Sequence, residues 1–519
     1  MCETMSDDEN SKILMLMQHR GFLWGPGPEI YDPVKGSYEY GPLGKLMKNN
    51  LERYMRRKFR RNGFWEVQCP LIGPEIVWEA SGHVERFFDY ITQCQNPKCG
   101  NVYRVDTLLE GLGYDLTAIP MDKWQDIITK EQIHCPDCES ELGKVTEQNL
   151  MVTSKIGFPA SEFILRPETA TTTYLTFPRL YKYFRTKMPI FVFQMGHAFR
   201  NEISPRNMLL RTREFEQCEG QIFITPDQEM SFEPYEDQKN SAIVLWSAEA
   251  QENNDKKYQK VSLEQCINDD ILQKPAYAWL LWLAYDIIKG LGIPDKSLRL
   301  RQHKMDERAH YAHDAWDLEI DSKIYGWTEV CGIHDRGDWD LGRHYEYSNK
   351  KSLKVPGPKK GQKQIPHILE IAFGVGRLFF FALELAFKFE EERNVLDLPV
   401  VLAPIPFAVF PLMKKPKGLK KLAKDVYGEL VDNDIGVVYD ESGSIGKRYR
   451  RTEEVGVRFA YTVDHQSLED NTLTIRNIED MSQKRINIDE IVDISTKIMR
   501  KTLTYDEIQD VEKEKTTKD

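Results

Sequence analysis

Two strand-like segments joined by a loop constrain the fold of this chain more than any other part of it. Residues 190–200 (IFVFQMGHAFR) and 212–225 (TREFEQCEGQIFIT) have the apolar and aromatic content of strands, and a proline-containing loop separates them. Two charged antiparallel strands with cross-strand Arg–Glu pairs would account for the charges alone. The complete order is more specific than that. It runs Phe199, Arg200, Asn201, Glu202, loop, Arg211, Phe215, Glu219.

This order is typical of an enzyme that activates a carboxylate with ATP. Such an enzyme must hold a bent triphosphate and neutralise charge at the α-phosphorus during in-line attack. One arginine can bridge the carboxylate and the α-phosphate, a second can reach the γ-phosphate, and an aromatic ring can stack on adenine. The pattern therefore favours an ATP site on two adjacent strands.

Composition limits the class of protein. The chain has 519 residues, of which 41% are hydrophobic, so we expect several domains with sizeable cores. No apolar run is long enough to cross a bilayer, and the acidic start MCETMSDDEN differs from a secretory or transit signal. We expect a cytoplasmic protein without a membrane partner. The net charge of −11 argues against a dedicated nucleic-acid coat, but local basic patches still allow an enzyme of nucleic acids.

Four of the nine cysteines form two close pairs, Cys94-x4-Cys99 and Cys135-x2-Cys138. Tetrahedral Zn²⁺ is bound by four thiolates, and two short-spaced pairs on turns can supply them. The alternatives are four unrelated reduced thiols, or His134 replacing one cysteine. We expect a structural zinc site, because no further group indicates an open coordination position.

Several motifs resemble the class II aminoacyl-tRNA synthetases, most closely the dimeric glycyl subgroup. The run FRNEISPRNMLLRTREFEQCE (199–219) resembles motif 2, and GVGR (374–377) before an apolar helix resembles motif 3. The helix and strand that end at Pro70 resemble motif 1, the dimer-interface element. Further similar segments are GSYEYGPLG (36–44), SGHVERF (81–87), RPETA (166–170) and GWTEVCGIHDRGDWDL (326–341). The resemblance covers about residues 20–500.

The resemblance implies an α+β fold: an antiparallel sheet flanked by helices, an inserted zinc module and a C-terminal α/β anticodon-binding domain. It implies that glycine and ATP, with Mg²⁺, form glycyl-adenylate, and that glycine is then transferred to the 3′ end of tRNA(Gly). A homodimer is also implied. The expected parts are 1–90 with motif 1, 91–150 as the zinc-binding insertion, 151–230 with motif 2, 231–300 as a polar helical insertion, 301–395 with motif 3, 396–505 as the anticodon-binding domain, and 506–519 as a charged tail.

The resemblance also assigns site residues. Arg200 and Arg377 are the catalytic arginines, and Phe215 stacks on adenine. The expected ATP-binding set is Arg200, Asn201, Glu202, Leu210, Arg211, Phe215, Glu329, Val330, Gly374, Val375, Gly376 and Arg377. The expected glycine-binding set is Arg86, Glu168, Phe215, Glu219, Arg336, Glu370 and Ala372. Carboxylates suit the substrate ammonium, and no editing domain is needed, because no amino acid is smaller than glycine.

Three positions around the expected substrate site depart from the family pattern. Thr171 and Thr172 stand where glutamine and glycine are usual, and Ala372 replaces a serine whose hydroxyl is expected near the glycine. In the C-terminal region, SIGKRYRRTEEVG (444–456) resembles the anticodon-binding domain, and Arg458 stands where proline is usual. Basic runs at 350–363, 414–421 and 447–451 are places where RNA could dock.

Two alternatives remain at this point. A sister synthetase for threonine, serine or proline would share the motifs, although Glu168, Glu219 and the segment 326–341 favour glycine. A synthetase-like accessory subunit of a DNA polymerase would bind nucleic acid without activating an amino acid. Loss of the arginines in motifs 2 and 3 would indicate such a subunit, and both Arg200 and Arg377 are present.

Overall fold

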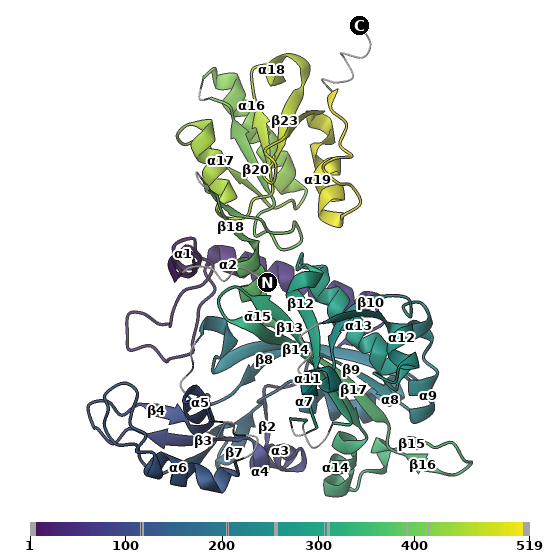
Figure 1. Cartoon of the computed structure of the whole chain (residues 1–519). Coiled ribbons are helices and arrows are strands. Elements are labelled where there is room, and N and C mark those ends of the chain that lie inside the picture. Colours follow the sequence, from purple (N-terminus) through teal and green to yellow (C-terminus); the bar gives the residue numbers. More distant parts are fainter. Residues whose placement is uncertain are drawn as a thin grey trace.

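The computed structural model describes residues 7–114, 116, 119–203, 205, 207–253, 258–305, 307–308, 312–390, 393–413 and 415–511. Three parts are visible in Figure 1: a large body around one sheet, a small module that includes β3–β5 and α5–α6, and a C-terminal domain that includes β20–β24. The expected α+β class is confirmed. Within the described ranges, every helix is too short or too polar to cross a membrane.

A nine-stranded sheet forms the centre of the large body. Its order is β1-β8-β9-β17-β14-β13-β12-β10-β11, and all neighbours from β8 to β12 are antiparallel. The strands are β1 (Trp65–Glu66), β8 (Ile190–Phe199), β9 (Glu214–Ile224), β10 (Ala242–Trp246), β11 (Gln259–Ser262), β12 (Leu298–Gln302), β13 (Asp314–Ser322), β14 (Gly326–Gly337) and β17 (His367–Gly374). The segments that carry motif 2 are thus paired neighbours, β8 and β9.

One face of this sheet is packed against three helices. They are α2 (Pro42–Arg61), α13 (Pro275–Lys289) and α15 (Val375–Ala386), and their apolar residues share a single core with the strands. Side chains alternate across a strand, so Leu369 and Ile371 of β17 enter this core. The residues that alternate with them, Glu370 and Ala372, face the other way. That second face is where polar residues collect.

The segment 231–300 differs from the expected polar helical insertion. It supplies β10, β11 and β12 to the large sheet, and α13 is buried on nearly all sides. The sequence YAWLLWLAYDII in α13 is apolar all round, as suits a helix enclosed by a sheet and other helices. The remaining helices of this region are short: α9 (Pro226–Met230), α10 (Glu233–Glu236), α11 (Ala248–Glu252) and α12 (Leu263–Asn268).

The cysteine-bearing module has its own small sheet and core. Strands β3 (Phe88–Gln93), β4 (Val102–Arg104) and β5 (Thr146–Asn149) form the sheet, and α5 (Val105–Gly111) and α6 (Trp124–Lys130) pack beside it. Its buried apolar residues are Val105, Leu109, Trp124 and Ile128. A core this small gives little stability without a further link.

The C-terminal domain is a five-stranded sheet covered on both faces. Its order is β21-β20-β22-β23-β24, with β20 parallel to β21 and β22. The elements are β20 (Phe407–Pro411), α16 (Lys417–Asp432), β21 (Val437–Tyr439), α17 (Ile445–Glu453), β22 (Phe459–Val463), α18 (Ser467–Asp470), β23 (Thr472–Asn477), β24 (Gln483–Asn487) and α19 (Ile491–Arg500). Tyr505 and Ile508 pack into its core, so the packed chain extends into the segment expected as a tail. Residues 512–519 of that tail lie outside the described residues.

Smaller elements complete the body. They are α1 (Asp7–His19), β2 (Ile72–Pro74), α3 (Glu75–Ala80), α4 (His83–Arg86), β6 (Val152–Ile156), β7 (Ser161–Leu165), α7 (Ala170–Tyr174), α8 (Phe177–Tyr183), α14 (Trp339–Ser348), β15 (Val355–Pro356), β16 (Lys363–Gln364), β18 (Phe387–Phe389) and β19 (Asn394–Leu396). The strand expected to end at Pro70 is short: only Trp65–Glu66 pairs, in parallel with β8.

Candidate active site

A cavity of about 630 Å³ opens on the face of the large sheet that α13 and α15 leave uncovered. Strands β9, β14 and β17 provide its floor, and the start of α15 and the segment η3 (Met208–Leu210) border it. Fourteen of the expected site residues line it. They are Glu168, Arg200, Glu202, Leu210, Arg211, Phe215, Glu219, Glu329, Arg336, Glu370, Ala372, Gly374, Gly376 and Arg377.

Four expected residues lie elsewhere. Val330 and Val375 are buried in the core behind the sheet, and Asn201 is not among the lining residues. Arg86 is exposed at the end of α4, outside the cavity lining. The same helix instead directs His83 toward the site, where its Nε2 lies 3.4 Å from Glu168 Oε2.

Three arginines form one end of the cavity. Arg200 donates from Nε to Pro167 O at 3.1 Å, and its guanidinium lies 5.2 Å from the ring centroids of both Phe87 and Phe215. Arg377 donates from Nη1 to the carbonyl of Glu329 at 2.9 Å and to its carboxylate at 3.1 Å.

The third arginine, Arg211, lies 3.7 Å from Glu202, measured from Nε to Oε2. All three guanidinium groups are thus held by neighbouring chain and line one space. A polyphosphate is the kind of ligand that such a group of fixed cations neutralises.

Carboxylates form the other end. Glu370 accepts hydrogen bonds from Tyr174 Oη and from Arg336 Nη1, the latter at 3.3 Å. Arg336 is 4% exposed and also makes a two-pronged contact with Asp340, at 2.6 and 2.7 Å. Glu219 accepts a hydrogen bond from Thr169 Oγ1. This end is preorganised, because each charged group is fixed by at least one partner.

The three carboxyl groups differ in their protonation. Burial, reinforced by the charges of Glu370 and Glu168, raises the pKa of Glu219 to about 8. Burial also raises the pKa of Glu168, but His83, together with Arg336 and Thr171, outweighs it and holds that pKa well below the usual range. At Glu370, Arg336 and His334 likewise outweigh burial and lower the pKa. A cationic ligand would complete the charge balance at Glu219.

The residues that depart from the family pattern have defined positions. Thr171 Oγ1 donates to Glu168 at 2.5 Å, so this threonine orients the carboxylate. Thr172 Oγ1 donates to Thr169 O at 2.8 Å and accepts from Gln194 at 3.2 Å. Ala372 lies directly between Glu219 and Gly332 in the sheet register. At this point of the cavity floor the sheet therefore carries only a methyl group.

Sequence reasoning missed four residues that shape the carboxylate end. His83, Tyr174, His334 and Asp340 each contact one of the expected residues. His83 and His334 lie inside quoted family segments, 81–87 and 326–341, so their neighbourhood was marked but their contacts were not. The His334–Glu370 contact depends on strand register, and the His83–Glu168 contact depends on where α4 packs; a sequence displays neither.

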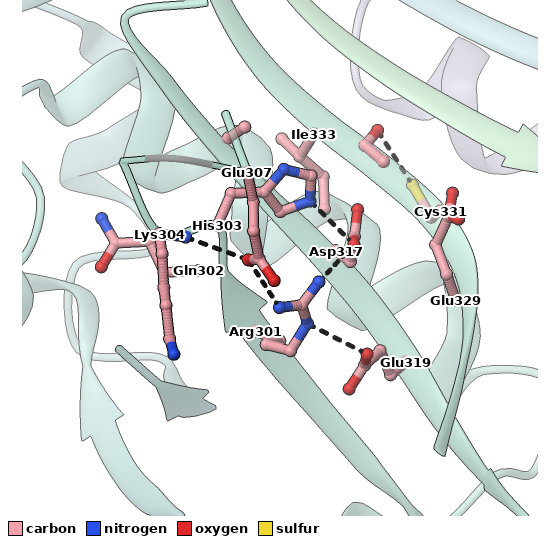
Figure 2. Close-up of polar contacts among 12 residues, drawn as sticks. Arg301, Gln302, His303, Lys304, Glu307, Asp317, Glu319, Glu329, Cys331 and Ile333 are labelled. Carbon is pink, nitrogen blue, oxygen red and sulfur yellow. Dashed lines mark hydrogen bonds and ion pairs between the residues drawn. The ribbon is translucent and has the colours of Figure 1, made fainter. Parts of the chain in front are cut away.

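A ladder of charged residues continues along the same face of the sheet, beside the cavity. Figure 2 shows Arg301 between the carboxylates of Glu307, Asp317 and Glu319. The distances from its guanidinium nitrogens to the carboxylate oxygens are 2.9, 3.5 and 3.3 Å, in that order. His303 Nε2 lies 2.8 Å from Asp317. Arg301 is thus held by three carboxylates, and these charged residues lie outside the cavity lining.

The four paired cysteines meet at one point in the small module. Their Sγ atoms all lie within 4.8 Å of one another, with Cys94–Cys138 at 3.5 Å and Cys99–Cys135 at 3.8 Å. Tyr103 Oη lies 3.1 Å from Cys135 Sγ, and hydrogen bonds with Ser140 lower the pKa of Cys138. This donor set fits a tetrahedral metal with thiolate ligands.

Comparisons with known proteins agree with this geometry. Residues 158–386 match the model of the tRNA synthetase class II core domain (G, H, P, S and T), and residues 407–498 match the anticodon binding domain. The glycine–tRNA ligase of Thermococcus gammatolerans is 35% identical to the chain, over 92% of this chain and 96% of the relative. That of Methanocaldococcus jannaschii is 34% identical, over 94% and 99%.

A solved structure gives a second comparison. It is described as the RNA binding domain of threonyl-tRNA synthetase from Cryptosporidium parvum Iowa II. It has a TM-score of 0.59 with this chain at 17% identity, and the match covers 94% of this chain and 98% of that one. At this identity the likeness concerns the fold alone. The comparisons that concern the choice of amino acid are those with the glycine–tRNA ligases, which are 34% and 35% identical to the chain.

Proposed function

Because this chain belongs to the glycine–tRNA ligases, a family of class II aminoacyl-tRNA synthetases, we propose that its cavity binds glycine and ATP through the residues described above. The enzyme attaches glycine to tRNA(Gly), in two steps by way of glycyl-adenylate. The observation that carries the assignment is one cavity with carboxylates at one end and arginines at the other. That polarity matches the ammonium of glycine and the phosphates of ATP.

At the carboxylate end, we propose that Glu168 and Glu219 bind the glycine ammonium. Glu219 ionises when the cation binds, because the cation replaces the repulsion from Glu168 and Glu370 with attraction. Arg336 and Tyr174 hold Glu370 in place as the third wall of this subsite. The glycine carboxylate then points toward Arg200, which borders both ends.

At the arginine end, Arg200 bridges the glycine carboxylate and the α-phosphate, and Phe215 supplies the surface for adenine. Arg211 and Arg377 bind toward the γ-phosphate, after exchanging part of their contacts with Glu202 and Glu329 for phosphate oxygens. Catalysis comes from positioning and charge neutralisation, because the attacking carboxylate is already ionised. Glu329 is the residue here that suits Mg²⁺ held jointly with phosphates, where the metal would neutralise charge.

Further assignments concern the rest of the chain. We propose that Cys94, Cys99, Cys135 and Cys138 bind structural Zn²⁺, and that the enzyme acts in the cytoplasm. We also propose a homodimer through α2 and β1. Exposed Leu46 of α2 and Trp65 of β1 support it, since large apolar side chains at a surface indicate an interface. A solution mass of twice 60.6 kDa would bear this out, and a monomeric mass would contradict it.

The test is amino-acid-dependent exchange of pyrophosphate into ATP. Glycine should support exchange, and threonine, serine and proline should not. Replacing Arg200 with alanine should lower glycine-dependent exchange by about 100-fold or more, because a positioned cation at the reacting phosphate is lost. Lys289→Ala, an exposed change at the end of α13, is the matched control. Exchange supported by threonine instead of glycine would refute the assignment, as would an unaffected Arg200→Ala enzyme.

A further inference from the structure

A row of small residues crosses the floor of the cavity. In the sheet register, Glu219 of β9 pairs with Ala372 of β17, Ala372 pairs with Gly332 of β14, and Gly332 pairs with Asp317 of β13. Carboxylates thus stand at both ends of the row, with only a methyl group and a hydrogen atom between them. Figure 2 shows Asp317 at the far end, held by His303 and Arg301.

The ring of His334 covers part of this row. A Cβ atom built on Gly332 would lie 2.9 Å from Cε1 and 3.5 Å from Nε2 of His334, so the imidazole lies back over the glycine. The ring is fixed there, because its Nδ1 lies 3.1 Å from Glu370 Oε1 on the neighbouring strand. His334 therefore fills the space that the missing side chain of residue 332 leaves open.

We propose that His334 is a specificity-determining residue: its ring closes the floor between Ala372 and Asp317 and denies room to any substrate side chain. This rests on the proposed function, which places the substrate ammonium at Glu219. An amino acid held there lies beside Ala372, since the two residues are cross-strand neighbours. A side chain directed along the row then meets the imidazole.

This arrangement is sufficient to select glycine. A pocket for the smallest amino acid needs only to exclude bulk, and a fixed ring does so without moving. The role differs from that of the carboxylates, which bind a group common to all amino acids. Because Ala372 carries no hydroxyl, selectivity at this floor depends on volume and not on a hydrogen bond from that position.

The experiment compares glycine and alanine in pyrophosphate exchange. His334→Ala should raise the ratio of kcat/KM for alanine to that for glycine by about 10- to 100-fold, since one methyl group in a pocket is worth that range. The ratio comes from one preparation, so partial inactivation cancels. His303→Ala is the matched control, because its ring centroid lies 6.5 Å from that of His334 and it does not line the cavity. It should keep the wild-type ratio.

His334→Asn is the second variant, since it retains a donor toward Glu370 but lacks the volume of the ring. It should raise the ratio as well. An unchanged ratio in both variants would overturn the proposal, and so would loss of exchange with both amino acids in both variants, because a wall residue is dispensable for activation. A wild-type enzyme without glycine-dependent exchange would instead refute the proposed function, so the two failures are distinguishable.

Discussion

Glu219 is the residue whose protonation couples most directly to substrate binding. Its pKa is raised to about 8, so the carboxyl is neutral below that pH and ionised above it. An ammonium group binds the ionised form, and the KM for glycine should therefore fall as pH rises from about 6 to 8, by up to about tenfold per unit. Steady-state exchange kinetics across this range would measure it.

Two variants separate this effect from a general one. Glu219→Gln should bind glycine weakly and with a flat pH profile, because its side chain cannot ionise. Glu168→Gln is the matched comparison: His83 holds the pKa of Glu168 low, so this carboxylate stays ionised. Its removal should raise KM and keep a pH dependence, shifted to lower pH, because the charge of Glu168 no longer raises the pKa of Glu219. A Glu219→Gln enzyme with the wild-type slope would show that another group titrates.

At the scale of elements, the cysteine module depends on its metal more than on its core. Its core has four buried apolar residues with eight partly buried ones packed against them, and a core of this size gives limited stability on its own. The isolated chain should contain about one zinc per protein. Chelation should expose residues 91–150 to proteolysis while the nine-stranded body stays intact, and added Zn²⁺ should restore protection.

The matched variants are Cys135→Ser, which should lose the metal, and Cys266→Ala, which removes a cysteine of the main core and should retain it. Metal analysis of both proteins decides the point. Full protection of residues 91–150 in a metal-free Cys135→Ser protein would contradict a structural zinc.

Motif-bearing elements were predictable from the sequence, and elements without motifs were not. Strands β8, β9 and β17 carry alternating patterns next to recognisable charges, and most of the expected cavity residues lie on them or at their ends. Segment 231–300 was misread because short strands and an all-round apolar helix have no clear period. His334 was missed for a different reason: its contact with Glu370 exists only through the β14–β17 register.

The same limit applies to the basic run 447–451. The expected RNA contacts come from a helix in which Arg448 is 2% exposed and donates to the carbonyl of Pro411. Arg451 is paired with Asp440. Lys447, Arg450 and Arg451 are exposed and Arg448 is not, so charge count alone overstated the surface available to RNA. Lys414, within the run 414–421, lies outside the described residues.

For the whole molecule, the question is how a chain with a net charge of −11 binds tRNA. The C-terminal domain is fixed to the body by Arg20–Glu454, Arg393–Glu453 and a hydrogen bond from Asn50 to Ala403 O. Helix α17 covers one face of its sheet, while α16 and α19 pack on the other. The basic residues of these helices therefore lie on different faces of the domain, and each face carries its own local positive charge.

Local cations make tRNA binding sensitive to salt even though the protein is acidic overall. The logarithm of the tRNA affinity should fall linearly with the logarithm of salt concentration, because phosphate contacts release counterions. The double variant Lys447→Ala and Arg450→Ala should bind tRNA more weakly. The magnitude of its slope should fall by about two, because each lost phosphate contact reduces it by about one. Lys497→Ala on α19, where Lys497 is paired with Asp493, should leave the slope unchanged. Filter binding across a salt series measures the slopes, and equal slopes for all three proteins would place the tRNA on another face.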